Sequence, residues 1–500
     1  VILLSGCTAG DKSVPILQTY SIRGTMFPIS ADGINYGGFS LISSAVKSIE
    51  KISEPSDRIL IGSYNMLYGT PEAFFTSGSA QIEIMNYMNY NGVVIGPREF
   101  YFGRKVLDKM IQEAEFPFIS SNIVTDSGSP IPGVVTHLVH KKSRTAIIGL
   151  APPYTLDQNL PEIVSGLSMI PPVEAVKQTI STLDSNIDSV IIIAGGFDPY
   201  IGDGMTSLTR DLLELEQVDY IYIGAASKET AGLYKTDITD SDGKAKSFIA
   251  VYAGDVVNGT GVDILNHAKN TYKVIPVNSS NLVPDKGLEE IMVRIRRTTE
   301  NILDEEVCYS LVQLDHNFTS ESPLGDAVTD ALREITETDI ILLHSGNIRN
   351  QLPKGVITKR NIYTIMPFGG NLVTGTITGE QLLTVLEKSI TYTEPDATGR
   401  GFLQVSGIHF TYNPNKQEGR RVYPDSVMVQ GEVLDQQKEY TFATDLYLFS
   451  GGDRFTTFQE LNIEAQRIYS KSTVLLLIDH LTQEAMIEAP EIDRITIQVQ

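Results

Sequence analysis

The chain has 500 residues, 42% of them hydrophobic, and a formal net charge of −22. This length is enough for two to four domains or for two large ones. The acidic excess argues against nucleic acid or an anionic membrane surface as a partner, because phosphate binding needs clustered Lys and Arg. The two cysteines, Cys7 and Cys308, are too few for a disulfide framework.

The N-terminal stretch is typical of the end of a bacterial secretory signal. Residues 1–6 read VILLSG and run directly into Cys7, so residues 4–7 match a lipobox. This pattern predicts a lipid on Cys7 and an extracytoplasmic lipoprotein, in the periplasm or outer membrane of a bacterium. The alternative is a truncated domain start with a chance cysteine. No other run approaches the ~20 apolar residues that span a bilayer.

From residue 14 to about residue 278, short apolar runs alternate with amphipathic segments of helix length. The expected strands are Ile16–Thr19, Ile59–Ser63, Val93–Ile95, Phe118–Ser121, Ala146–Gly149, Val190–Ala194, Tyr220–Gly224 and Phe248–Tyr252. The expected helices are Phe39–Ile52, Val106–Ala114, Pro172–Leu183 and Leu208–Leu215. This alternation predicts a layered α/β or α/β/β/α sandwich with its functional residues on loops at the carboxyl ends of strands.

The pattern changes after a long charged segment. Residues 284–305 carry apolar side chains at helical spacing and predict a partly exposed helix between two domains. Beyond it, a helix is expected at 322–334, strands at 340–343 and 371–378, and a helix at 379–389. Mixed α+β structure is therefore the expectation for this half.

Five stretches near predicted strand ends carry related motifs. They read LQTYSIRG at 17–24, SYNMLYGTP at 63–71, VIGPREFYFG at 94–103, DSVIIIAGGF at 188–197 and YIGAASK at 222–228. In this order they resemble the five metal-binding loops of calcineurin-like metallophosphoesterases of the 5′-nucleotidase family. That resemblance implies a site for two divalent cations, held by His and carboxylate side chains, that binds phosphate and activates water.

The side chains at the family's ligand and catalytic positions do not suit this chemistry. Those positions hold Ser21, Arg23, Asn65, Pro97, Arg98, Gly195 or Gly196, Ala226 and Lys228. Asn65 is the one ligand-type side chain that remains, and an amide is a poor anionic bridge. The two arginines and the lysine add positive charge where cations would bind. We therefore expect a degenerate site with no catalytic residues and no metal cofactor.

The number and positions of the histidines also argue against a paired-metal site, and this argument does not depend on the family resemblance. Only three of the seven, His137, His140 and His267, precede the expected linker helix, and none of them is expected at the end of a sheet strand. His137 and His140 lie three apart on a probable strand, so they point to opposite faces rather than to one metal. A rebuilt metal site from Glu99, Asp198 or Asp203 is the alternative; otherwise these are solvated loop acids.

The C-terminal half carries a second set of motifs. They read ESPLGDAVTDAL at 321–332, HSGNIR at 344–349, YTIMPFGGNLV at 363–373, GFLQVSGIHF at 401–410 and YLFSGGDRF at 447–455. They resemble the substrate-binding domain of bacterial periplasmic 5′-nucleotidases/UDP-sugar hydrolases and of animal ecto-5′-nucleotidase. The two sets cover nearly the whole chain in order. They imply a four-layer α/β/β/α metallophosphoesterase-like sandwich (14–282), a linker helix (283–305) and an α+β 5′-nucleotidase C-terminal domain (306–500), after the N-terminal segment 1–13.

The second resemblance also implies a ligand site. A base would stack between Phe368 and Tyr447, Asp453 would accept from ribose hydroxyls, and Arg349 would meet the sugar or phosphate. The alternative for the two rings is ordinary core packing. His344 replaces an Asn expected near the base. The arginines that clamp phosphate in the family have no counterpart between residues 315 and 319, so a nucleoside is favoured over a nucleotide.

Three functions are consistent with these patterns. The first is a non-catalytic lipoprotein that binds a nucleoside or nucleotide or acts as a scaffold. The second is an active nucleotide or phosphoester hydrolase with a rebuilt metal site. The third is an interaction subunit that docks to an active family member without binding a small ligand.

Overall fold

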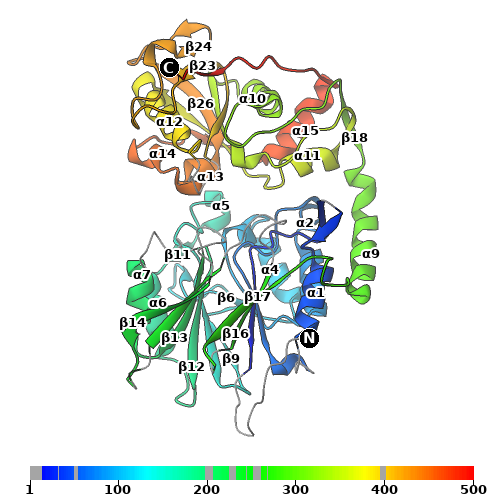
Figure 1. Cartoon of the computed structure of the whole chain (residues 1–500), viewed down its shortest axis with the longest axis vertical. Helices are drawn as coiled ribbons and strands as arrows, with labels where there is room; N and C mark the ends of the chain where they lie inside the picture. Colours follow the sequence, from blue (N-terminus) through cyan, green and yellow to red (C-terminus); the bar gives the residue numbers. More distant parts are fainter. Residues whose placement is uncertain are drawn as a thin grey trace. The chain divides into compact units, whose positions relative to one another are not determined.

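A computed structural model describes residues 14–31, 33–49, 54–196, 206–224, 232–241, 243, 245–251, 261–266, 269–394 and 401–499. The chain forms two compact units, residues 1–299 and 300–500. Their boundary falls inside α9 (Lys286–Leu303), which confirms a long helix in the expected linker segment (Figure 1). Cys7, Asp198, Asp203, Ala226, Lys228 and His267 lie outside the described residues.

Two sheets form the centre of the first unit. The first sheet, in spatial order, is β17 (Thr271–Pro276), β16 (Gly261–Asn266), β1 (Ile16–Tyr20), β4 (Ile59–Ser63), β5 (Gly92–Val94), β6 (Phe118–Ile119) and β8 (Val134–Val135). The second is β14 (Gly232–Thr239), β15 (Ala245–Val251), β13 (Val218–Gly224), β12 (Ser189–Ala194), β10 (Thr145–Gly149) and β9 (His137–His140). All eight expected strands are present. Strands β1, β4, β5, β6 and β8 run parallel to one another, and so do β10, β12, β13 and β15.

Burial explains why these strands read as continuous apolar runs. One core cluster joins Ile16, Ile59 and Ile61 of the first sheet to Ile147, Ile191 and Ile193 of the second. The opposite face of the first sheet is covered by α1 (Phe39–Lys47), α3 (Ser79–Tyr87) and α4 (Arg104–Glu113). The opposite face of the second is covered by α6 (Pro172–Ile180) and α7 (Ser207–Leu213). Each sheet is therefore buried on both faces, and the α/β/β/α prediction is confirmed.

Two details of the first unit differ from the predictions. Helix α1 ends at Lys47 rather than Ile52, because the Ser48 hydroxyl donates 2.7 Å to the Ala45 carbonyl and competes with the helical bonds. His137 and His140 are the two end residues of β9, so the expectation that no histidine would end a strand is wrong. Both are occupied locally: His137 Nδ1 pairs with the Thr136 hydroxyl at 3.0 Å, and His140 Nδ1 with the Ser143 hydroxyl at 2.8 Å.

The second unit is α+β, as predicted, with three sheets. The largest has the order β22 (Leu403–Ser406), β19 (Ile340–His344), β26 (Glu439–Asp445), β21 (Leu372–Thr378), β27 (Arg467–Ile468). The smaller sheets are β20 (Gly355–Thr358), β18 (Glu306–Ser310), β28 (Met486–Ile487), and β25 (Glu432–Val433), β24 (Met428–Val429), β23 (Ile408–Tyr412), β29 (Ile495–Ile497). The main helices are α10 (Pro323–Thr336), α11 (Lys359–Ile365), α12 (Gly379–Thr391) and α15 (Thr473–Glu484), with the short α13 (Leu446–Phe449) and α14 (Thr457–Glu460).

Local sequence signals set the ends of the long helices. The Ser322 hydroxyl accepts from the Gly325 N–H at 3.2 Å and Pro323 occupies the first turn, so α10 begins there. Thr378 and Gln381 form a capping box that starts α12. Within the described part of the chain, no helix combines the length and the apolar character that crossing a bilayer requires.

Candidate functional site

Four of the five expected loops meet at one edge of the first unit, where the parallel strands end. The Ser21 N–H donates to the Ser63 carbonyl at 3.0 Å, and the Arg23 N–H donates to the Asn65 carbonyl at 2.8 Å. The Arg98 N–H donates to Asn65 Oδ1 at 3.1 Å. The loops after β1, β4 and β5 are therefore tied together around Asn65, as the resemblance implies. Of the fifth motif, residues 222–224 end β13, and residues 225–228 lie outside the described residues.

These loops hold an unusual backbone. Ser21, Arg23, Tyr64 and Asn65 all adopt left-handed conformations, with φ of 49°, 54°, 59° and 55°. Non-glycine residues rarely occupy this region because it costs them free energy, and such conformations concentrate at functional sites. Four of them within two adjacent loops make this edge a candidate functional site on backbone geometry alone.

Glu99 fastens this edge from inside the protein. It is fully buried, and its Oε1 accepts from the Met66 and Leu67 N–H groups at 2.7 and 3.3 Å, while Oε2 accepts from the Gly96 N–H at 2.8 Å. Burial raises the pKa of Glu99, and these three donors oppose the rise. Glu99 is thus neither a solvated loop acid nor a metal ligand facing the edge, and both expectations for this residue are wrong.

Tyrosine rings occupy the place where the fourth loop would contribute its histidine. Tyr20 and Tyr64 stack with ring centroids 5.7 Å apart, and the Tyr64 and Tyr154 hydroxyls lie 3.2 Å apart. The Gly196 N–H donates to Tyr20 Oη at 3.0 Å, and Tyr154 Oη donates to the Gly196 carbonyl. A Cβ atom on Gly195 would lie 2.9 Å from Tyr64 Cβ. A histidine at this position and Tyr64 in its present place therefore exclude each other.

The donor atoms at this edge do not fit a pair of divalent cations. Asn65 Oδ1 already accepts from a backbone N–H, and Arg23 Nε donates to the Ser21 hydroxyl at 3.1 Å. The Pro97 carbonyl accepts from Asn159 Nδ2 at 3.0 Å. Burial and the neighbouring Tyr64 raise the pKa of Tyr20, which disfavours its anionic form. Among the described side chains, hydroxyls, an amide and guanidinium groups stand where His and carboxylates are required.

Replacing Gly195 with alanine is expected to cost about 1–3 kcal/mol of folding free energy, because the added methyl meets Tyr64 Cβ at 2.9 Å and Tyr20 Cε2 at 3.2 Å. Tyr64→Gly removes the main obstacle and suits the left-handed backbone, so the double variant should recover about 1 kcal/mol or more of that cost. Urea unfolding of the four members of the cycle measures this coupling. Gly232→Ala, whose nearest neighbour lies at 3.8 Å, is the control and should change little. Additive single effects would contradict the packing described here.

In the second unit, three of the five residues expected at a ligand site contact one another. Asp453 Oδ2 pairs with His344 Nε2 at 2.8 Å, and Asp453 Oδ1 accepts from the Tyr447 hydroxyl at 2.9 Å. The His344 and Tyr447 rings lie 5.7 Å apart. Gly452 backs the Tyr447 ring, since a Cβ there would lie 2.4 Å from it. The side chain of Asp453 remains 28% exposed, so the group is reachable from solvent while held in place.

Arg349 and Phe368 form a second pair. The Arg349 guanidinium lies over the Phe368 ring at 4.8 Å from its centroid and over Phe318 at 5.7 Å. Its backbone N–H donates to the Ile365 carbonyl at 2.9 Å, which fixes the loop that follows β19. Both aromatic rings of the expected stack, Phe368 and Tyr447, are half-buried rather than core residues. Their stacking on a base stays a prediction.

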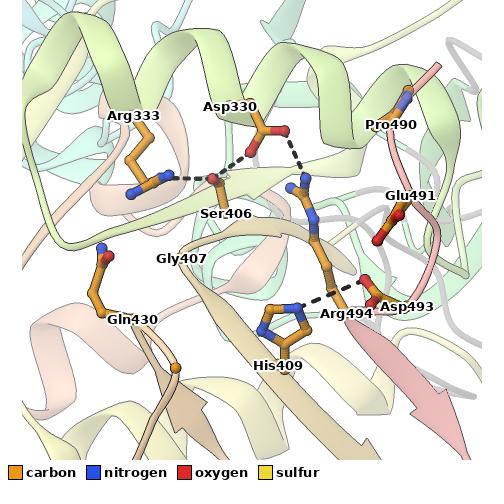
Figure 2. A pocket seen from close by; sticks show the side chains of 11 residues that line it. Asp330, Arg333, Ser406, Gly407, His409, Gln430, Pro490, Glu491, Asp493 and Arg494 are labelled. Atoms are coloured by element: carbon orange, nitrogen blue, oxygen red, sulfur yellow. Dashed lines mark hydrogen bonds and ion pairs between the residues drawn. The ribbon is translucent and has the colours of Figure 1, made fainter. Parts of the chain in front are cut away.

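A cavity of about 380 Å³ in the second unit is lined by other residues (Figure 2). Arg333 Nε donates to the Ser406 hydroxyl at 2.9 Å, and that hydroxyl donates to Asp330 Oδ1 at 2.6 Å. Arg494 Nη2 donates to Asp330 Oδ2 at 2.6 Å. The wall of the cavity is thus made of polar and charged side chains that hydrogen-bond to one another. None of the five residues expected to bind a ligand lines this cavity, although Asp330, Ser406, Gly407 and His409 stand in two of the quoted motifs.

Sequence reasoning also missed the tyrosines at the first unit's edge. Tyr20 and Tyr64 stand inside two of the quoted motifs, each next to a position that the resemblance assigns to a metal ligand, Ser21 and Asn65. The signal available in the sequence was a large aromatic residue next to a position where the family has a metal ligand. Tyr154 had none, because it comes from a separate loop that only the tertiary fold brings close.

Comparisons with known proteins agree with the fold. Residues 298–460 match the family model described as 5′-nucleotidase, C-terminal domain. Protein 5NUC of Lutzomyia longipalpis is 24% identical over 484 residues, covering 86% of this chain and 81% of that protein. Human 5′-nucleotidase is 24% identical over 514 residues, covering 90% and 85%. The chain spans only 37% of another relative, Endonuclease YhcR of Bacillus subtilis, at 22% identity over 88% of this chain.

Solved structures show the same architecture. The 5′-nucleotidase precursor from Thermus thermophilus superposes with a TM-score of 0.71 at 22% identity, covering 98% of this chain and all of that one. A putative 5′-nucleotidase from Staphylococcus aureus gives a TM-score of 0.75 at 18% identity, covering 97% of this chain and all of that one. The predicted fold class, a metallophosphoesterase-like sandwich followed by a 5′-nucleotidase C-terminal domain, is confirmed. Residues 298–460 therefore belong to the 5′-nucleotidase C-terminal domain family, and the chain as a whole is similar to 5′-nucleotidases in sequence and fold.

Proposed function

We propose that this protein is a non-catalytic member of the family that binds a nucleoside, or another planar ligand, through its C-terminal unit. The observation that carries the proposal is the packing of Tyr20, Tyr64 and Tyr154 around Gly195 and Gly196. Phosphoester hydrolysis by paired cations needs His and carboxylate ligands with open coordination positions. At this edge of the first unit, tyrosine rings and arginine guanidinium groups stand where those ligands would be.

The alternative is an active nucleotide or phosphoester hydrolase with a rebuilt metal site. Such a site requires Asn65, Glu99 and Asp198 to converge. Glu99 points into the interior with both oxygens on backbone N–H groups, and Asn65 Oδ1 accepts from a backbone N–H. Two of its three members are therefore already engaged in holding the loops, which favours the non-catalytic reading.

The ligand proposal rests on the second unit. A nucleoside base needs flat rings, which Phe368 and Tyr447 supply in half-buried positions. The partly exposed Asp453 carboxylate would accept from ribose hydroxyls, and the neighbouring His344 holds it in place. Residues 315–319, DHNFT, carry no arginine to clamp a phosphate. A nucleoside therefore suits this unit better than a nucleotide does.

Phe368→Ala is expected to weaken adenosine binding by about 10- to 100-fold, because one base–aromatic stack is worth ~1–3 kcal/mol. Titration calorimetry of the whole chain measures the change. Phe27→Ala is the matched control: Phe27 also lies beneath an arginine, with Arg296 at 3.8 Å from its centroid, but in the first unit. It should leave the affinity unchanged.

Other outcomes separate the remaining functions. Absence of heat with both adenosine and uridine would remove the ligand proposal and favour docking to an active family member. Release of phosphate from AMP or UDP-glucose in Mn²⁺, Co²⁺ or Zn²⁺ would establish the hydrolase instead. Equal weakening by Phe368→Ala and Phe27→Ala would show that the site lies elsewhere.

We also propose an extracytoplasmic location, with a lipid anchor on Cys7 as the lipobox pattern predicts. Mass spectrometry of the N-terminal peptide from the native host tests the anchor. A mature N-terminus with an unmodified Cys7 would rule it out.

A further inference from the structure

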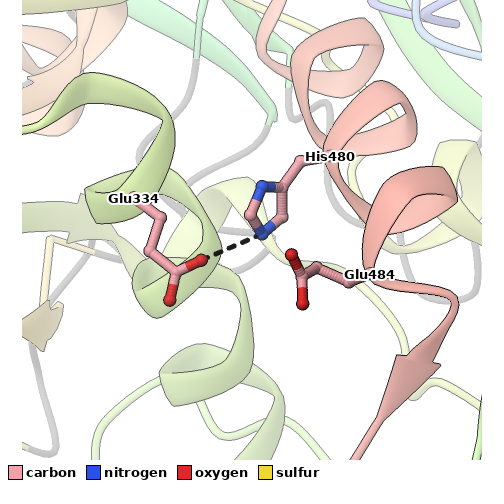
Figure 3. Close-up of side chains that lie close together, drawn as sticks. All are labelled: Glu334, His480 and Glu484. Atoms are coloured by element: carbon pink, nitrogen blue, oxygen red, sulfur yellow. Dashed lines mark ion pairs between the residues drawn. The ribbon is translucent and has the colours of Figure 1, made fainter.

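The ends of two helices in the second unit bring together three side chains with metal-binding groups. Glu334 lies in the last turn of α10, and His480 and Glu484 lie one turn apart at the end of α15 (Figure 3). One ligand atom from each falls within 4.8 Å of the others. From this arrangement we propose a binding site for one Zn²⁺-type divalent cation, separate from the family's metal edge in the first unit.

The distances match those that a small cation requires. His480 Nε2 lies 3.4 Å from Glu334 Oε2. Two ligands at about 2.0–2.1 Å from a tetrahedral zinc lie roughly 3.3 Å apart, so this pair is already at the right separation. Glu484 shares a helix face with His480, because residues four apart lie one above the other. One of its carboxylate oxygens lies within 4.8 Å of the other two ligand atoms, and a water would fill the fourth position of a bound ion.

The backbone under the site is held rigidly. Helix α15 buries Leu477, Ile478 and Leu481 around His480. Its end is fixed by Ala485, whose N–H donates to the Leu481 carbonyl at 3.0 Å and whose carbonyl accepts from the Tyr309 N–H at 3.0 Å. Such fixed positions lower the ordering cost of binding, because only side-chain torsions remain to be set.

Charge and ligand chemistry select the kind of cation. The last turns of both helices carry partial negative charge, which adds to the two carboxylates. The side chain of His480 is 16% exposed and therefore mostly covered, while Glu334, at 63%, faces solvent. Imidazole with carboxylate suits Zn²⁺ and related transition ions, whereas Mg²⁺ and Ca²⁺ prefer oxygen ligands alone. Bound there, the cation clamps α10 to α15.

The test is titration calorimetry of the chelator-treated full chain with ZnCl₂. We expect one equivalent to bind, and His480→Gln to weaken it by at least about 10-fold, since loss of even an indirect partner costs that much. Glu334→Gln, at an exposed position with little effect on folding, should weaken it as well. His409→Gln is the matched control, because His409 pairs with a single carboxylate, Asp493, at 3.7 Å.

Unchanged zinc binding in both site variants would overturn the proposal, as would absence of binding to the wild type. In that case His480 and Glu334 form an ordinary ion pair. The result is independent of the proposed function: cations held by the first unit would appear as extra equivalents that survive His480→Gln.

Discussion

Glu99→Ala is expected to lower the free energy of unfolding by about 3–5 kcal/mol. The variant leaves the N–H groups of Gly96, Met66 and Leu67 buried without an acceptor, and each such group costs roughly 1–3 kcal/mol. A cavity at a fully buried position adds to the loss. Urea unfolding of the whole chain measures it, with separate transitions fitted for the two units.

Two further variants make this experiment specific. Glu99→Gln keeps one acceptor oxygen and should lose less than Glu99→Ala. Glu113→Ala removes an exposed acid that pairs with Lys109 at 3.5 Å on α4, and it should stay within about 0.5 kcal/mol of wild type. A loss for Glu99→Ala no larger than that for Glu113→Ala would show that the carboxylate does not hold the loops together.

The second large effect is a pH dependence from Asp326. Burial raises the pKa of Asp326 from 3.8 to about 8, although Arg494, at 3.7 Å, opposes the rise. Between pH 4 and pH 8 the folded chain keeps a proton that the unfolded chain has lost. Stability from this group is therefore complete below about pH 4 and falls as the pH rises to about 8, by on the order of 5 kcal/mol.

Asp326→Asn should flatten this dependence, because the amide resembles the protonated acid and carries no charge at any pH. Unfolding of the second unit at pH 5 and at pH 8 measures the difference. Asp425→Asn, at an exposed position, is the control and should keep the wild-type slope. If Asp326→Asn kept that slope too, another group would be responsible.

The layers of the first unit were predictable because its strands are buried on both faces. Runs such as 190–194 and 220–224 are continuously apolar. A strand in a sheet that is covered on both faces buries all of these side chains. Helix α1 was predicted too long, since periodicity continues past Ser48 while the hydroxyl ends the helix locally. The loops were found through their motifs, and four of the five meet at one edge.

The arrangement of the side chains could be predicted from the sequence to a lesser extent. The interior role of Glu99 depends on N–H groups from a loop more than thirty residues earlier in the chain, at 66 and 67. The spacing of His480 and Glu484 is legible in the sequence as a helix pair, but Glu334 joins them only through the packing of α10 on α15. Pairs of this kind depend on tertiary contacts that a single sequence does not display.

The most direct test of the account is the metal content of the His480→Gln variant after equilibration with Mn²⁺ and Zn²⁺ and removal of the unbound ions. This variant weakens the proposed site in the second unit, so cations that stay bound in stoichiometric amount would report on the edge around Asn65 and Gly195. We expect well under about 0.2 equivalents per chain. About two equivalents, as a paired-cation phosphoesterase requires, would contradict the central claim.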